Sequence, residues 1–538
     1  MSLSPGKASD KTMASKQQAL RNLVIVFGDS LDPNAAAFDG FDAAHDAVWM
    51  AEVAEECTHV WAHKKRIAVF FAAMRHFRDE LRGRGVRVHY RELPNEATDD
   101  DAPSFSALLQ RELPRLSPQH LVVTHPGDYR VLQELQTTAK ALAIALDVRP
   151  DRHFFETPQS FLAWDSEHPG APMETFYRHM RTKHEVLVTA QRKPEGGSWN
   201  FDKENRASFG RVGPQELNEP PRFAPSQTTN AVVALVEHRF GSHPGRIGTL
   251  DLPLTPAQAQ TWLDDFITHR LPSFGKFEDA MWSGQPVLYH SRLSFLLNLK
   301  LIDPRTCVDA ATAAYHIGNA PLAAVEGFVR QIVGWREYVR GIYWTRMPAY
   351  AHLNALDCSD RDVPSFFWDG RTRMACVADS MKALIDEGYT HHIVRLMVLG
   401  LFALLLGVHP RKFHEWHMAM YLDAIDWVSL PNALGMSQYG DGGIIGTKPY
   451  AASANYINRM SNHCGQCVYD PKQSLGEKAC PFNSLYYDFL ARHEDRLAKN
   501  PRMTMQMRNM SRKTNDDLVQ LRRKADETRD RIDSGREV

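Results

Sequence analysis

Three cysteines crowd into one short stretch near the end of the sequence. Cys464 and Cys467 are separated by two residues, and Cys480 follows after twelve more, with a proline directly behind it. Thiolates at this spacing can bind one metal centre, and a Cys-Pro ending is typical of iron–sulfur ligand runs. A fourth ligand must come from elsewhere, and Cys376, in its polar-flanked stretch, is a better candidate than Cys358. The spacing alone leaves open an iron–sulfur cluster, a zinc ion or an unliganded set.

A second group of residues could hold a phosphate. Ser291 and Ser294 flank Arg292 at the start of an amphipathic helical pattern. Hydroxyls, backbone N–H groups and a cation suit a phosphate there, although serine also caps many helices for structural reasons alone. Downstream, the stretch EGFVRQIVGWREYVRGIYW (326–344) interleaves arginines with tryptophan and tyrosine. Cations and flat rings along one helix suit a nucleotide cofactor or an extruded base.

Two adjacent histidines open a strongly apolar helical pattern. His391 and His392 precede Arg395 in THHIVRLMVLGLF (390–402). An imidazole with its ordinary pKa of about 6.5 can give and recover a proton around neutral pH. A histidine at the start of a core helix also commonly serves as a cap or a packing residue. The pair therefore allows both a catalytic and a structural interpretation.

The elements that must position these residues fall into two classes. Short apolar runs at 22–27, 86–90 and 120–125 alternate with helical patterns, which predicts a parallel sheet covered by helices on both faces. From about residue 255 to 495 the apolar spacing is helical almost everywhere. We therefore predict five segments: a mobile tail (1–20), an α/β domain (21–155), an interdomain connection (156–254), an all-α domain (255–495) and a charged C-terminal extension (496–538).

Composition excludes several classes of protein. The chain has 538 residues, 43% of them hydrophobic and 24% charged, which excludes a wholly disordered protein. Its net charge of −1 means that any nucleic-acid binding must come from a local patch. Seven unevenly placed cysteines argue against a disulfide framework. The N-terminal stretch has no apolar core, and the longest apolar run (396–408) is too short to cross a bilayer, so we expect a soluble cytoplasmic protein.

Taken together and in order, these segments resemble a known family. SRLS, RQIVGWREY, HHIVRLM and DAIDWVSLPN are similar to the flavin-binding helical domain of the photolyase/cryptochrome family. GGSWNFDKENR, DGGIIGTKPYAASANYINRMS and the cysteine set are similar to its bacterial iron–sulfur branch, FeS-BCP, also called prokaryotic (6-4) photolyases. The resemblance runs from about residue 21 to 495. It implies an N-terminal α/β antenna domain, a long linker and a large all-α FAD-binding domain with an iron–sulfur cluster.

The same resemblance implies an activity and its alternatives. It implies light-driven repair of (6-4) pyrimidine–pyrimidone photoproducts in DNA, by electron transfer from excited reduced FAD. A cryptochrome-type blue-light sensor would have the same fold and the same cofactors. A flavin-free iron–sulfur protein that binds nucleic acid, in the manner of primase large subunits, is the third interpretation, and the SRLS and HHIVRLM segments speak against it.

Residue roles follow from the resemblance. The segment RQIVGW has one residue more than its counterpart in other photolyases, which obscures which side chain there faces the flavin. Leu396 stands where animal (6-4) enzymes have a second histidine. The implied FAD contacts are Ser291, Leu293, Ser294, Gln331, Arg336, Arg395 and Asp423, the last of these facing flavin N5. The implied catalytic and lesion-pocket residues are His392 as the proton donor, His391 beside it, Asp423, Met436, Tyr439 and Tyr450.

Electron transfer, the cluster and the antenna are implied in the same way. The implied electron-transfer residues are Trp416, Trp368 and Trp427. The implied ligands of a [4Fe–4S] cluster are Cys376, Cys464, Cys467 and Cys480, which leaves Cys57, Cys307 and Cys358 as ordinary thiols. A 6,7-dimethyl-8-ribityllumazine antenna is expected near Gly28, Asp29, Ser30 and residues 52–56. Mg²⁺ is a further possible cofactor, for which no carboxylate cluster stands out in the sequence. We expect UV-damaged DNA as the partner of a monomer in the bacterial cytoplasm.

Overall fold

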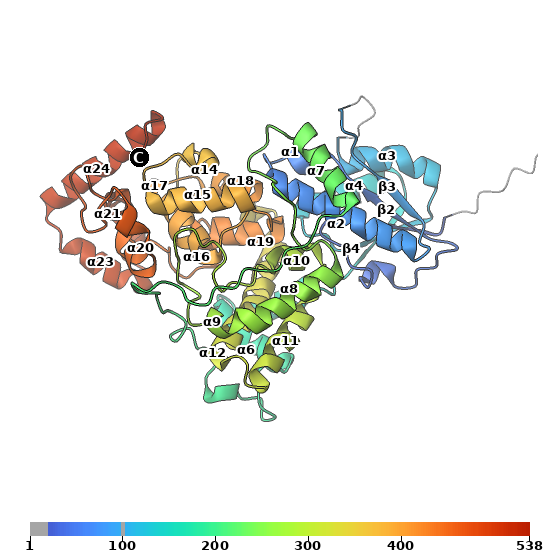
Figure 1. The fold of residues 1–538 in the computed structure, drawn as a ribbon, viewed down its shortest axis with the longest axis horizontal. Coiled ribbons are helices and arrows are strands. Elements are labelled where there is room, and N and C mark those ends of the chain that lie inside the picture. The colour runs from blue at the N-terminus through green and yellow to red at the C-terminus, as the bar shows by residue number, and fades with distance from the viewer. Residues whose placement is uncertain (1–19, 98–102) are drawn as a thin grey trace, which may run out of the picture.

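The structure is a computed structural model that describes residues 20–97 and 103–538. The predicted mobile tail (1–20) lies outside the described residues except for Leu20. Two parts are visible in Figure 1: a blue and cyan part that contains the strands, and a larger helical part that runs from green to red.

The first part is built on one parallel sheet. Its strand order is β3-β2-β1-β4-β5, and every neighbouring pair is parallel. The predicted runs at 22–27, 86–90 and 120–125 are confirmed as strands, whereas two further strands were not predicted. The strands are β1 (Asn22–Ile25), β2 (Ala47–Ala51), β3 (Val88–Arg91), β4 (His120–Thr124) and β5 (Ala145–Arg149).

Helices cover both faces of this sheet, as predicted. Alternate residues of a strand point to opposite faces, and β1 shows this clearly. Leu23 and Ile25 pack with α3 (Phe105–Leu116) and α4 (Tyr129–Ala141). Val24 belongs to the cluster that contains α2 (Lys64–Gly83) and continues into the helical part. One face of the sheet therefore shares its apolar core with the rest of the molecule.

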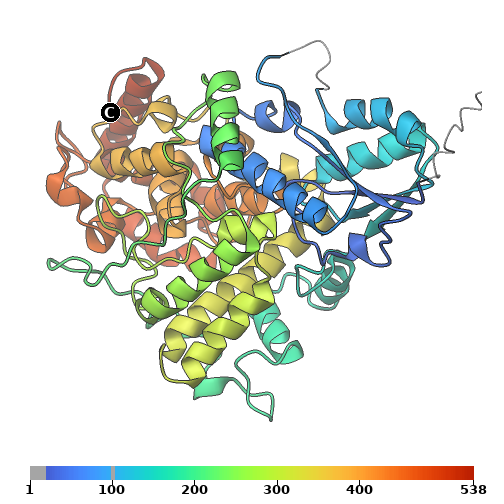
Figure 2. The same cartoon turned by 45° about the vertical axis from the view of Figure 1, so that its right-hand side comes forward.

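The segment between the two parts is partly helical. It contains α5 (Pro158–Glu167), α6 (Met173–Lys183) and α7 (Gln227–Arg239). Helix α7 packs along α2, and Figures 1 and 2 both show it as a green helix beside the blue one. Helices α5 and α6 pack instead against α13 (Glu337–Arg346) and the turn before it. The segment between the two parts therefore packs against both of them: α7 against the α/β part, and α5 and α6 against the helical part.

All regular elements after residue 255 are helical, as predicted. The longer helices that build this part are α8 (Pro256–His269), α11 (Pro304–His316), α12 (Leu322–Val329), α13, α15 (Ala375–Glu387), α18 (Pro410–Met420) and α21 (Pro481–Arg492). The shorter helices are α1 (Glu55–Thr58), α10 (Ser294–Leu299), α14 (Phe366–Asp369), α16 (His392–Val394), α17 (Leu401–Leu406), α19 (Asp426–Leu430) and α20 (Ala454–Met460), and all of them except α17 carry site residues. No helix among the described residues is both long and apolar enough to cross a membrane.

The charged C-terminal extension forms helices, of which α24 (Asn515–Asp533) is the longest. Thr514 and Asp517 cap its start reciprocally, which satisfies two backbone N–H groups. Its buried residues Leu521 and Ala525 face α21, and Arg529 pairs with the buried carboxylate of Asp488 on that helix. Figure 1 shows this helix in dark red at the edge of the helical part.

Candidate functional site

A cavity of about 1050 Å³ lies inside the helical part. This volume is at the upper end of ordinary small-molecule sites, which range from roughly 300 to 1,000 Å³. Segments far apart in the sequence form its wall, including the connection residues Asn200, Asp202 and Arg206. The predicted residues that line it are Ser291, Leu293, Ser294, Gln331, Arg336, His392, Arg395, Asp423, Trp427, Met436 and Tyr450. The fold therefore gathers in one cavity most of the residues that the sequence singled out. Tyr439 is not among the lining residues.

Three π-helical segments contribute to this wall: η3 (Arg330–Arg336), η5 (Arg395–Gly400) and η6 (Pro431–Ser437). A π-helical turn accommodates an extra residue within a helix and is frequent at functional sites. The first of the three coincides with the stretch RQIVGWR, which the sequence analysis found to be one residue longer than in related proteins. The extra residue is thus absorbed by widening the helix, and Gln331 and Arg336 both still reach the cavity.

A loop before α10 brings a cation to the cavity. The carbonyl of Ser291 accepts a hydrogen bond from the indole of Trp262 at 2.8 Å, and Arg292 has a left-handed backbone with a φ of 54°. The guanidinium of Arg292 stacks on Tyr389, 4.7 Å from the ring centroid. Its Nε and Nη2 atoms are buried and have no hydrogen-bond partner in the described part of the chain. Buried donors need an acceptor, so this geometry suits an anionic ligand.

The carboxylate of Asp423 is held from two sides. Arg395 donates to both of its oxygens, at 2.9 and 3.1 Å, and the hydroxyl of Ser294 donates to Oδ2 at 2.5 Å. Burial alone would raise the pKa of Asp423, but the charge and hydrogen bonds of Arg395 outweigh it and leave this pKa below its ordinary value. Asp423 is therefore an anion at neutral pH, and it can accept a proton but has none to donate.

Of the two adjacent histidines, His392 is the one that lines the cavity, and its side chain is exposed. Burial among the surrounding protein, followed by the charge of Arg395, lowers its pKa to about 4. His391 does not line the cavity: it is buried behind the wall, where its ring stacks on His290 at 4.3 Å. The structure thus separates the two members of the predicted pair.

Charged residues that the sequence analysis missed lie at another part of the cavity wall. Burial and the nearby cations Arg502 and Arg206 lower the pKa of Lys448. Three carboxyl groups, Asp202, Glu278 and Asp279, lie in the same cavity, where burial raises the pKa of Glu278 to about 8. These residues come from the connection, from the loop before α10, from the loop before α20 and, for Arg502, from the C-terminal extension, so no local motif joins them.

The four predicted cysteine ligands line one small cavity. Cys376, Cys464, Cys467 and Cys480 surround it together with His463, whereas Cys358 does not. Burial, and then the charges of the other three cysteines, raise the pKa of the Cys376 thiol. Among the described residues no three His, Cys, Asp or Glu side chains converge as the ligands of a single metal ion do.

Comparison with known proteins decides the family. The chain is 45% identical over 508 residues to the (6-4) photolyase of Agrobacterium fabrum, which covers 94% of this chain and 98% of that protein. The chain belongs to the photolyase family. Residues 24–252 also match the family described as deoxyribodipyrimidine photo-lyase-related protein. The predicted resemblance to the bacterial (6-4) photolyases is confirmed.

Solved photolyases share the fold. A class III photolyase from Agrobacterium tumefaciens has a TM-score of 0.57 at 14% identity, covering 91% of this chain and 100% of that one. An archaeal photolyase from Sulfolobus tokodaii has a TM-score of 0.53 at 13% identity, covering 88% of this chain and 100% of that one. The predicted architecture, an α/β domain followed by a large all-α domain, is therefore confirmed.

Membership of the photolyase family implies FAD, and the large cavity suits this group. Its volume is sufficient for a dinucleotide. The Nε and Nη2 atoms of Arg292 make no hydrogen bond in the described part of the chain, although Nη2 lies 3.7 Å from the carboxylate of Glu387, so they offer donors for phosphate oxygens. Arg336 has a second role beside the cavity, because its guanidinium donates to the carbonyl of His153 at 2.9 Å and lies 3.9 Å from the ring centroid of Phe154. It therefore also fastens the helical part to the end of the α/β domain.

The predicted electron-transfer tryptophans do not form one group. Trp416 is fully buried, and its indole donates to the carbonyl of Phe367, the neighbour of Trp368, at 2.9 Å. Trp427 lines the cavity elsewhere and packs edge-on against Phe154 at 5.0 Å. Among the described residues no ring contact joins Trp427 to either of the other two.

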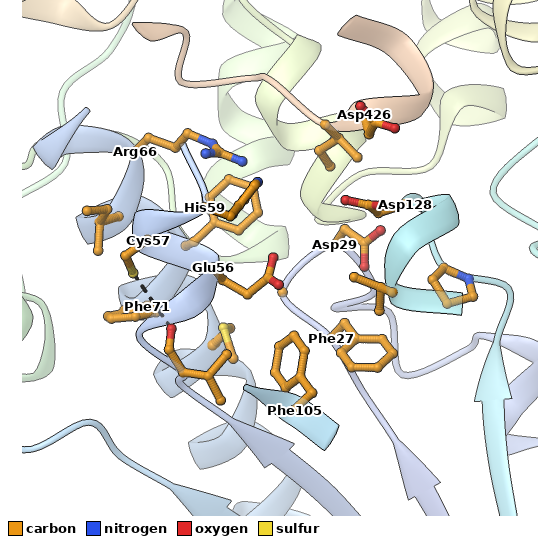
Figure 3. A pocket seen from close by; sticks show the side chains of 18 of the residues that line it. Phe27, Asp29, Glu56, Cys57, His59, Arg66, Phe71, Phe105, Asp128 and Asp426 are labelled. Atoms are coloured by element: carbon orange, nitrogen blue, oxygen red, sulfur yellow. Dashed lines mark hydrogen bonds between the residues drawn. The ribbon is translucent and has the colours of Figure 1, made fainter. Parts of the chain in front are cut away.

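A second pocket of about 100 Å³ lies where the sheet of this photolyase meets its helical part (Figure 3). Phe27, Gly28 and Asp29 at the end of β1 line it, together with Val53 and Glu56 from the predicted stretch 52–56. Ser30 does not line it, because its hydroxyl accepts a hydrogen bond from Lys300 instead. Figure 3 shows acidic side chains on one side of this pocket and rings on another; the labelled examples are Asp29, Asp128, Asp426, Phe27 and Phe105.

Proposed function

We propose that this photolyase repairs (6-4) pyrimidine–pyrimidone photoproducts in DNA, with His392 as the proton donor. One observation carries the proposal: the imidazole of His392 is exposed within the same cavity that the Arg395–Asp423 pair and the Ser291–Ser294 loop line. Proton transfer and cofactor binding thus share a single enclosed space.

FAD, when bound and fully reduced, supplies an electron to the lesion after absorbing blue light. The chain's own residues would hold it: Ser291, Leu293 and Ser294 with Arg292 at its phosphates, and Gln331 on the neighbouring π-helical wall. Arg395 and Asp423 form a fixed dipole beside it, because both are locked by hydrogen bonds. A dipole that is already oriented costs no reorganisation when charge moves.

His392 must be protonated before it can donate. Its pKa of about 4 makes it neutral at pH 7 in the free protein. An anionic phosphodiester brought into the cavity would raise this pKa, because a nearby opposite charge favours the protonated imidazole. His392 would then donate its proton to the hydroxyl that moves back between the two bases, and recover it afterwards. Binding of the lesion would thereby protonate His392 and make it able to donate its proton.

The same cavity offers surfaces for an extruded lesion. A base must leave the duplex to reach an enclosed site, and it needs apolar and aromatic groups to pack on. Met436 and Tyr450 supply such groups in the wall. Arg206, Lys448 and Arg502 line the same cavity as cations, and we propose that they bind the phosphates that flank the lesion.

Two further cofactors complete the proposal. We propose that Cys376, Cys464, Cys467 and Cys480 bind a [4Fe–4S] cluster, because they alone among the cysteines share one cavity. We propose that the pocket beside β1 binds a lumazine antenna. The ends of parallel strands are where such folds hold their ligands.

The test is a repair assay on an oligonucleotide that carries one (6-4) photoproduct. The reduced, FAD-loaded protein is illuminated with blue light, with a dark reaction as the control. We expect light-dependent repair in the wild type and in His316→Ala, an exposed histidine outside the cavity, and loss of repair in His392→Ala. A loaded wild-type protein that binds the lesion but never repairs it would contradict the proposal and favour the blue-light sensor.

A further inference from the structure

A tryptophan that was not predicted as an electron-transfer residue extends the aromatic series to the surface. Trp61 belongs to the loop between α1 and α2 in the α/β domain, and 47% of it is exposed. Its ring lies 5.3 Å from that of Trp368 on α14, with a 44° angle between the planes. The contact therefore joins an exposed indole of one domain to a half-buried indole of the other.

Hydrogen bonds across the domain boundary fix the loop that carries Trp61. The backbone N–H of His63 donates to the carbonyl of Ala419 at 2.8 Å, and its ring bonds the carbonyl of Ile385 at 3.0 Å. Lys65 donates to the carbonyl of Asp386 at 2.6 Å. Because these bonds follow Trp61 by only a few residues, the indole is held against the helical domain rather than left to move freely.

The series continues inward from Trp368. Its neighbour Phe367 lies 4.8 Å from the ring of Trp416 and accepts the indole hydrogen bond of that residue. Trp416 in turn packs against Phe413 at 5.4 Å, and Phe413 and His417 both line the large cavity. The contacts thus lead from Phe413 in the cavity wall to Trp416 and Phe367, and from Trp368, the next residue in the chain, to Trp61.

We propose that Trp61 is the terminal electron donor of this photolyase during light-driven reduction of its flavin. This inference rests on the proposed function, since it concerns how the bound cofactor is brought to its reduced state. Each excitation draws one electron inward from Trp416. Trp368 then refills Trp416, and Trp61 refills Trp368, so the electron deficiency ends on the exposed indole.

Oxidised Trp61 is converted back to its resting form at the protein surface. Oxidised Trp61 releases its indole proton to water and becomes a neutral radical. A small thiol in solution then supplies one electron and one proton, which restores the indole and leaves a thiyl radical. Water stabilises the transient charge better than the protein interior does, and this favours the exposed Trp61 over the half-buried Trp368 as the end of the series.

The test uses the full-length, FAD-loaded protein and two substitutions at the same position. Trp61→Phe keeps a ring in place but cannot be oxidised at these potentials, whereas Trp61→Tyr keeps an oxidisable ring beside water. Trp282→Phe, a half-buried tryptophan outside the series, is the control. With a thiol present, we expect flavin photoreduction to slow several-fold in Trp61→Phe, and to stay close to wild type in Trp61→Tyr and Trp282→Phe.

Two readouts separate electron transfer from structure. Peptide mass spectrometry after illumination without thiol should find oxygen added to Trp61 in the wild type, and added to Trp368 instead in Trp61→Phe. Repair by protein reduced chemically in the dark should be unchanged in all variants. Equal slowing in the Phe and Tyr variants, or no oxidation at Trp61, would overturn the inference. A wild type that neither photoreduces nor repairs would instead overturn the proposed function.

Discussion

Arg395 meets Asp423 end-on with two parallel hydrogen bonds, at 2.9 and 3.1 Å, in the wall of the large cavity. Tyr421 covers the other side of the guanidinium, 4.0 Å from its ring centroid. Both charged groups are largely withdrawn from water, so each depends on the other for compensation. This dependence makes the pair the most sensitive point of the site to a change of charge.

Asp423→Asn should destabilise the protein strongly at neutral pH. Removing one partner of a buried pair leaves the other charge uncompensated, which costs about 3 to 5 kcal/mol. Because the pKa of Asp423 is lowered in the folded state, its contribution is present above the unfolded value of about 3.9 and is lost as the pH falls through the folded pKa. The difference from the wild type should therefore shrink in acid. Urea unfolding at several pH values measures it.

The control for that experiment is an exposed pair. Arg411 and Glu415 lie one helical turn apart with about half of each side chain exposed. Glu415→Gln should change the free energy of unfolding by only about 0.3 to 0.5 kcal/mol. Equal effects of the two substitutions would contradict the structural role assigned to the buried pair.

His392 should titrate far below an ordinary histidine in the free protein. Its pKa is lowered to about 4, so the folded state binds fewer protons than the unfolded state between pH 4 and 6.5. Stability should therefore rise with pH across this window. His392→Gln should flatten that slope. NMR of labelled histidines should show the same resonance titrating at higher pH once lesion-containing DNA is bound, and an unchanged pKa would contradict the proposed switch.

Asp128→Asn should stabilise the protein in alkaline but not in acidic solution. Burial, and then the charge of Asp426, raise the pKa of Asp128 to about 7. A raised carboxyl pKa favours folding at low pH, and that contribution is lost as the pH rises through 7. Asparagine keeps the N-cap bond to the backbone of Arg130 without the charge. We expect a gain of at least about 1 kcal/mol at pH 8 and little difference below pH 4. A gain that does not vary with pH would contradict this origin.

Cys376→Ala should abolish the cluster, whereas Cys358→Ala should not. Cys376 is buried and Cys358 is partly buried, and only Cys376 shares a cavity with Cys464, Cys467 and Cys480. Loss of visible absorbance and of iron, together with a lower melting temperature, is expected for the first variant alone, because a bound metal centre contributes its binding energy to folding. Iron retained in Cys376→Ala would contradict the assignment.

Lys448→Ala and Arg502→Ala should each weaken DNA binding in a salt-dependent way. Each phosphate contact that is removed lowers the slope of log K against log salt by about 0.9. Arg87→Ala, an exposed cation on the α/β domain, should leave the slope unchanged. Binding isotherms at several salt concentrations, on DNA with and without the lesion, measure the slopes. Unchanged slopes in the first two variants would show that Lys448 and Arg502 do not contact the DNA phosphates.

The sequence was most informative where one segment carries its own signal. The strand at 22–27 could be predicted because its composition marks it locally. At 330–336 the resemblance indicated an extra residue but not the π-helical segment that contains it. Strand β2 was not predicted, because all five of its residues are buried. Its sequence therefore lacks the alternation of apolar and polar residues that distinguishes a strand from a core helix. His391 and His392 could not be told apart, since which of two neighbours faces a cavity depends on the orientation of the helix.

Residues contributed by distant segments could not be predicted at all. Asp202 and Arg206 reach the cavity because the connection folds back over it, and Glu278 reaches it from the loop before α10. The proposed role of Trp61 depends on its contact with Trp368, which lies about three hundred residues away in the other domain. Only the assembled tertiary structure creates these neighbourhoods.

The pocket beside β1, which we propose as the antenna site, has a consequence for how light harvesting can change in this family. Its wall is shared: Met418, Ile425 and Asp426 close it from the helical domain, opposite Phe27 and Glu56. A chimera that exchanges only the first 155 residues would join two half-pockets of different origin. A new pigment would therefore require matched changes at both ends of the gene, and domain shuffling alone would produce a protein with a poorly fitting binding site.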